Sequence, residues 1–254
     1  MEFMDFAVSL LRWFHIAAGL FFIGLNWWFN FVFTPYNMVA ATETRKNVLL
    51  ELIPRALYWF RWAALYTAIL GIGLLVTVFY SGGLTIESQQ PWSMWSYVMV
   101  VLAILLYKVY DLLAKSPIGK DIRIFGVVGL LVVAAYVYAM QQFGQFSYRG
   151  YVIHVGVLFG VIMIGNVWEK IWPAQKKVLN AVKAGTPPDP AQFALVTQRG
   201  RHNTYLSIPL LWTMIEAHTA VPAANSWLYL IVVIVIGWGA VALAFTASEK
   251  TKGW

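Results

Sequence analysis

The sequence contains no cysteine, and this absence excludes several kinds of redox centre. With no cysteine among its 254 residues, the chain has no disulfide, thiolate metal site, iron–sulfur cluster or covalently attached c-type haem, since each needs a cysteine sulfur. Any metal or haem bound by this protein must be held by other side chains.

Charge is the second thing the sequence has little of. Charged residues make up 11% of the chain and hydrophobic residues 60%, whereas soluble domains carry about 25% charged residues. This balance is typical of an integral membrane protein whose main contact is the lipid bilayer. The formal net charge of +7 is then a signal of membrane orientation, and we expect no nucleic-acid partner.

What the chain has instead is a series of seven long apolar stretches. Each is continuously apolar and does not alternate, which favours helices over a membrane barrel. The predicted fold is therefore an all-α integral membrane protein, a bundle of about seven transmembrane helices forming a single domain over residues 1–254. The expected spans are 10–33, 55–80, 92–113, 122–142, 149–172, 202–219 and 226–247.

The basic residues of the loops predict the orientation. Lysine and arginine gather in alternate loops and at the C-terminus, and the opposite set of loops carries only Arg12 and Arg149. By the positive-inside rule the N-terminus is outside and the C-terminus cytoplasmic. The long loop 173–201 is then cytoplasmic. Its sequence predicts two short amphipathic helices, the second with Asp189 as N-cap and Pro190 at its first position.

Four histidines are the candidate ligands for a redox centre, because ionisable residues in membrane spans are expected to be functional. In the predicted orientation His15, His154 and His218 lie in the outer leaflet, and His202 lies at the inner face. A rise of roughly 24 Å separates His202 from His218, so these two cannot share an iron. One b-type haem held by two of the three outer histidines fits this layering better than two stacked haems.

His15 with His154 is our first choice of ligand pair. Gly19 lies one turn from His15, and Gly156 lies close to His154. Small residues of this kind let a porphyrin approach a helix backbone closely. The pair would give a single haem b with two histidine ligands.

Three further outer residues each allow more than one interpretation. Arg12 and Arg149 lie one to two turns outward of the proposed ligands, where they would pair with haem propionates or snorkel to the interface as ordinary arginines. His218 is the alternative haem ligand, a hydrogen-bond partner at the haem edge, or a solvated histidine at a helix end.

A different hypothesis, a binding site for a substrate, concerns the inner end of the sixth span. Arginines and unpaired N–H groups at a helix start favour anions, so a planar anionic substrate or a quinone headgroup would suit this place. The alternative is that Asn203 or Thr204 is a helix cap and the arginines are topology signals. The candidate substrate-binding residues are Arg199, Arg201, His202, Asn203 and Tyr205.

These motifs together resemble the membrane domain of the bacterial cytochrome-c-fused urate oxidases, also called urate hydroxylases. The most specific stretch is QRGRHNTYLSIP at 198–209, with His218 closing the same span. The other matching segments are RWFH at 12–15, HVG at 154–156, GNV at 165–167 and PPDP at 187–190. The resemblance extends over essentially the whole chain.

The resemblance implies a location and a partner. It implies a bacterial inner-membrane protein assigned to urate oxidation, in a family whose membrane part is followed by a c-type cytochrome. Because this sequence has no cysteine and ends at Trp254, we expect the c-type cytochrome, or another redox subunit of a respiratory chain, to be a separate protein.

Three functions stay open at this point. The first is an oxidoreductase that oxidises urate or a similar substrate and passes electrons to the separate cytochrome. The second is a non-catalytic haem-b subunit that transfers electrons for, or anchors, a dehydrogenase or respiratory complex. The third is a haem-free structural subunit. The sequence identifies no catalytic residue for the first.

Overall fold

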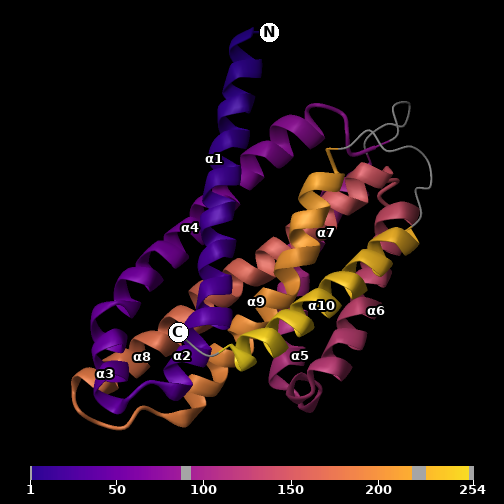
Figure 1. The fold of residues 1–254 in the computed structure, drawn as a ribbon. Coiled ribbons are helices and arrows are strands. Elements are labelled where there is room, and N and C mark those ends of the chain that lie inside the picture. The colour runs from indigo at the N-terminus through magenta and orange to yellow at the C-terminus, as the bar shows by residue number, and fades with distance from the viewer. Residues whose placement is uncertain (1, 87–92, 219–226, 252–254) are drawn as a thin grey trace. The chain divides into compact units, whose positions relative to one another are not determined.

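The computed structural model describes residues 2–86, 93–218 and 227–251, and these segments contain helices and no strand (Figure 1). The expected span ends at residues 92, 219 and 226 lie outside the described residues. In the first half of the chain the elements are α1 (Glu2–Trp27), π-helical η1 (Trp28–Phe33), α2 (Thr34–Val39), α3 (Thr42–Glu51), α4 (Ile53–Leu74) and π-helical η2 (Leu75–Tyr80). They are followed by α5 (Met94–Lys115), 3-10 helix η3 (Pro117–Lys120), α6 (Ile122–Gln142), α7 (Tyr148–Gly165), π-helical η4 (Asn166–Ile171), α8 (Trp172–Lys183), α9 (Pro190–Glu216) and α10 (Trp227–Lys250).

Six of these helical stretches are long and apolar enough to cross a bilayer, which makes the chain a multi-pass membrane protein. They correspond to six of the seven expected spans. Their bounds are Phe3–Val39, Ile53–Tyr80, Met94–Lys115, Ile122–Gln142, Tyr148–Lys183 and Trp227–Lys250. The seventh expected span, 202–219, falls within α9 and just beyond it, and α9 is not among the six apolar stretches found in the described chain.

The segment between α7 and the end of α9 differs from the expected loop. The first predicted amphipathic helix is α8, which continues directly from η4. The second is not short, because it forms the opening turns of the 27-residue helix α9. The cap is as predicted: Pro190 opens α9, and the Oδ1 atom of Asp189 accepts a hydrogen bond from the N–H of Ala191 at 2.8 Å.

The chain divides into two compact units, which are described separately below. Unit 1 comprises Met1–Gly73, Met163–Ser207 and Trp238–Trp254, and unit 2 comprises Leu74–Ile162 and Ile208–Gly237. The boundaries fall inside α4, α7, α9 and α10. His15 and His202 therefore belong to unit 1, whereas His154 and His218 belong to unit 2.

Three helices contain a π-helical segment, and each segment contributes a polar side chain used below. They are Asn30 in η1, Tyr80 in η2 and Asn166 in η4. Such π-helical insertions are rare and are often found at functional sites.

Candidate functional site

A buried polar network is centred on α9 in unit 1. The Nδ2 atom of Asn203 donates to the carbonyl of Met163 at 3.0 Å, and its Oδ1 atom accepts from Nδ2 of Asn166 at 2.8 Å. Both asparagine side chains are fully buried. The amide of Asn203 therefore joins α9 to the junction of α7 and η4.

The same buried face of α9 is joined to α1. Nδ2 of Asn26 donates to Oγ1 of Thr204 at 3.0 Å, and the indole N–H of Trp27 donates to Oγ of Ser207 at 2.8 Å. Asn26, Thr204 and Ser207 are buried. Because polar groups in a membrane interior must find partners, these bonds specify how α1 packs on α9 within unit 1.

A small cavity with a largely apolar lining lies beside this network. Its volume is about 70 Å³, counted as space open to the centre of a water molecule. That volume is several times the roughly 10–15 Å³ that one ordered water requires. It is lined by Asn26, Phe29, Asn30, Phe33, Thr34, Leu57, Phe60, Ile171, Gln175, Val196, Thr197 and Gly200. Its walls therefore combine aromatic and aliphatic side chains with a few amides.

Gly200 helps to keep this cavity open. A Cβ atom at this position would lie 3.3 Å from Oδ1 and 3.5 Å from Nδ2 of Asn30. The Asn30 amide is itself positioned by a bond from its Nδ2 atom to the carbonyl of Asn26 at 2.9 Å. A larger residue in place of Gly200 would push against this amide.

The five expected substrate-binding residues lie on two different faces of α9. Arg199, His202 and Asn203 are buried in unit 1. Arg201 is exposed, with its guanidinium carbon 4.7 Å from the ring centre of Phe245, and the Tyr205 ring is 5.8 Å from the same ring. The structure thus brings three of the five residues to one face and places the other two against α10.

His15 has its tautomer set by the backbone of α4. Its Nδ1 atom lies 2.9 Å from the carbonyl of Thr67. A carbonyl can only accept, so Nδ1 carries the proton and Nε2 keeps its lone pair. The ring lies against Gly71, where an added Cβ would be 2.9 Å from the imidazole Cε1. Glycine at this position is therefore required for the ring to pack as it does.

His154 shows the same arrangement in unit 2. Its Nδ1 atom lies 2.7 Å from the carbonyl of Gly150, and so Nε2 is again the lone-pair nitrogen. Here Nε2 accepts a hydrogen bond from the hydroxyl of Tyr80 at 2.9 Å. The buried ring also packs on Phe146, with ring centres 4.6 Å apart.

His218 also belongs to unit 2 and is exposed at the end of α9. Its ring lies 5.5 Å from that of Phe79, the residue before Tyr80. His154 and His218 thus contact consecutive residues of η2. Nearby in sequence, the carboxylate of Glu216 accepts a hydrogen bond from the hydroxyl of Tyr148 at 3.1 Å.

The family of this chain follows from a comparison with known protein families. A family model described as Urate oxidase N-terminal matches residues 42–253. The chain belongs to this family. No curated protein and no solved structure matches the chain. The family match includes α9, His154 and His218, whereas Arg12, His15 and Gly19 precede its first residue.

The remaining sequence-predicted residues of this urate oxidase N-terminal chain have varied surroundings. Arg12 is exposed and Arg149 is half-buried. A Cβ on Gly19 would make an ordinary contact of 3.7 Å with the methyl group of Thr67. Gly156 is far more crowded, since a Cβ there would lie 2.5 Å from Oγ1 of Thr213. The open side of Gly156 is thus already taken by α9.

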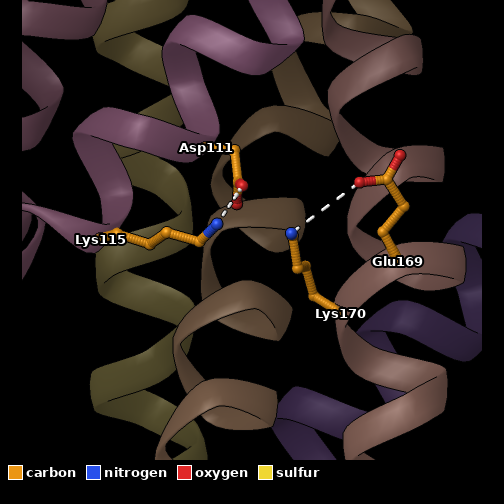
Figure 2. Close-up of polar contacts among 4 residues, drawn as sticks. All are labelled: Asp111, Lys115, Glu169 and Lys170. Carbon is orange, nitrogen blue, oxygen red and sulfur yellow. Dashed lines mark hydrogen bonds and ion pairs between the residues drawn. The ribbon is translucent and has the colours of Figure 1, made fainter.

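Figure 2 shows two ion pairs, one in each unit. In unit 2 the ammonium of Lys115 lies 2.6 Å from Oδ2 of Asp111, one turn earlier on α5. In unit 1 Lys170 lies 3.8 Å from Oε2 of Glu169, its neighbour in η4. No group of three or more His, Asp or Glu side chains able to hold a metal ion occurs among the residues that the structure describes.

Several residues that form these sites could not be identified from sequence patterns. Thr67 and Tyr80 bind the histidines from positions 52 and 74 residues away in the chain. Gln175 and Thr197 line the cavity. None of the four belongs to a motif, and only the folded chain brings them to their partners.

Proposed function

We propose that this chain is the membrane redox domain of a urate-oxidising system in the bacterial inner membrane. In this proposal it binds one haem b and passes electrons from urate, or a similar purine, to a separate c-type cytochrome or to the respiratory chain. The family match supports the urate part of the proposal. The six apolar helices support its place in a bilayer.

The haem part of the proposal rests on which ring nitrogen is protonated in His15 and in His154. Haem b, when bound, would supply one-electron exchange. His15 and His154 would hold it, with His218 as the alternative ligand. Iron-binding imidazoles usually donate their other N–H to a carbonyl, and Nδ1 of His15 and of His154 lies 2.9 Å and 2.7 Å from one. Each ring therefore presents Nε2 as the nitrogen able to ligate.

Tyr80 places a condition on this role for His154. Its hydroxyl occupies Nε2 at 2.9 Å, so ligation by His154 requires this hydroxyl to turn away. Exchanging Tyr80 for phenylalanine would remove the competing donor and leave the ring in place. The proposal therefore expects haem content in Tyr80→Phe to equal or exceed that of the natural protein.

A spectrum of the purified chain tests the haem proposal. A reduced-minus-oxidised spectrum with pyridine haemochrome analysis should show low-spin haem b. His15→Ala and His154→Ala should each abolish it, whereas His202→Ala should retain it. A pigment-free preparation would instead favour a structural subunit, and loss of haem only in the His202 variant would overturn the ligand assignment.

A second function, a non-catalytic haem-b subunit that anchors a dehydrogenase, is favoured by one observation. Both polar atoms of the Asn203 amide are engaged in internal hydrogen bonds, so this expected substrate-binding residue has a structural task. The two functions differ in what reduces the haem. Urate-dependent reduction of the chain alone supports the oxidase, and reduction only with an added dehydrogenase supports the anchor subunit.

A further inference from the structure

A caged arginine on α4 is the most unusual feature outside the sites described above. The guanidinium carbon of Arg61 lies 4.1 Å from the ring centre of Trp172 and 5.5 Å from that of Trp168. It also lies 5.6 Å from the ring of Trp62 and 5.8 Å from that of Tyr58. Four aromatic rings from α4, η4 and α8 therefore surround one cation in unit 1.

This cage contains hydrogen-bond donors that the described part of the protein does not satisfy. Nε of Arg61 and the indole N–H groups of Trp62 and Trp168 are buried and have no acceptor among the described residues. Arg61 also forms no ion pair with a carboxylate among the described residues. An unpaired cation inside a membrane span is costly, so an acceptor beyond the described residues would stabilise it.

The surface next to the cage is suited to hydrocarbon. Tyr66, Ile69 and Ile72 follow Trp62 along one side of α4, and their exposed fractions are 54%, 55% and 62%. They lead from Arg61 further into the apolar span Ile53–Tyr80. A ligand with an anionic head at the cage and an apolar tail along this stripe would match both features.

Exposed basic side chains follow the cage along α8. Trp172 is the first residue of α8, and Lys176 lies one turn later on the same face and is exposed. Lys177 beside it is also exposed. Basic amphipathic helices of this kind attract anionic lipid. We propose that Arg61 and its aromatic cage bind the phosphate of an anionic phospholipid, whose acyl chains lie along Tyr66, Ile69 and Ile72.

Arginine suits this role better than lysine would. Its planar fork can donate two parallel hydrogen bonds to phosphate oxygens while its faces stack on tryptophan. A lysine at position 61 would keep the charge but lose the fork and the stacking. The site is independent of haem and of urate, so it can be tested whether or not the proposed function holds.

The experiment uses the full-length protein, purified in detergent and stripped of lipid. Binding of dioleoylphosphatidylglycerol, dioleoylphosphatidylcholine and dioleoylglycerol is measured by native mass spectrometry and by the shift of the unfolding midpoint. The first lipid should bind several-fold more tightly than the second and at least about tenfold more tightly than dioleoylglycerol, which has no phosphate, because hydrogen bonds to charged groups contribute about that factor.

Matched variants locate the binding to the cage. Arg61→Gln should weaken phosphatidylglycerol binding by about tenfold or more, and Arg61→Lys by a smaller factor. Arg55→Gln removes an exposed cation from the same helix and should leave the affinity within about twofold. The lysine variant keeps the charge, so it tests the fork even if the glutamine variant fails to fold.

Two results would overturn the proposal. The first is equal loss of lipid binding in Arg55→Gln and Arg61→Gln, which would indicate diffuse attraction to the basic surface. The second is tight binding of inorganic phosphate that added lipid does not displace, which would indicate a site for a free anion. Failure of inorganic phosphate to displace the lipid supports the phospholipid site.

Discussion

Replacing Gly71 by alanine should disturb His15 in a way that a neighbouring replacement does not. The added Cβ would lie 2.9 Å from Cε1 and 3.4 Å from Nδ1 of the imidazole. The ring cannot move away freely, because Nδ1 is bonded to the carbonyl of Thr67 at 2.9 Å. Gly73→Ala on the same helix is the control, since its Cβ would only touch Leu11 at 3.8 Å.

The size of the effect follows from these contacts. Both variants gain up to about 1 kcal/mol of helix propensity over glycine. Gly71→Ala alone also loses a hydrogen bond of about 1 kcal/mol and adds overpacking strain of about 1–3 kcal/mol. The two variants should therefore differ by about 2–4 kcal/mol, which corresponds to roughly 10 °C in unfolding midpoint for a chain of this size.

The assay is thermal unfolding of both variants in detergent, followed by absorbance of bound haem in the same samples. We expect Gly71→Ala to melt lower than Gly73→Ala and, if His15 ligates iron, to lose haem as well. Equal midpoints would refute the packing argument. A lower midpoint with unchanged haem would show that His15 has a structural role only.

Two further predictions concern packing in the two units. In unit 2, Gly156→Ala should lower the unfolding midpoint by the equivalent of about 1–3 kcal/mol, because the new methyl group meets Oγ1 of Thr213 at 2.5 Å. Gly160→Ala, one turn later with nothing within 4 Å, should not destabilise the protein. In unit 1, Asn203→Leu should cost about 1–3 kcal/mol in a denaturation assay, since it removes two buried hydrogen bonds, one of them from the amide of Asn166. A midpoint unchanged by Asn203→Leu would show that this network contributes nothing to stability.

The parts of the fold that sequence predicts well are those with local causes. Six apolar runs became six helices, because continuous hydrophobicity of membrane length leaves the backbone no other way to satisfy its hydrogen bonds. The start of α9 was predictable for a similar reason. The side chain of Asp189 caps the helix, and the ring of Pro190 favours the first helical position, so both effects are local.

The parts that sequence missed depend on contacts between distant segments. The polar composition of residues 190–201 suggested a loop with a short helix, yet these residues are the opening turns of α9. Arg199 is buried in unit 1, and the local sequence pattern does not predict this burial. The π-helical segments and the partners of His15 and His154 likewise arise only when the helices pack.

The two faces of α9 bear directly on how a substrate would meet this chain. On the buried face, Asn203, Thr204 and Ser207 bind neighbouring helices, so these three side chains contribute to the folding of unit 1. A small molecule bound in the cavity of unit 1 would contact Gln175 and Thr197, which belong to no motif. Within the motif on α9, Asn203 thus forms part of the framework of unit 1. Substitutions at Gln175 should alter substrate dependence, and those at Asn203 should alter stability first.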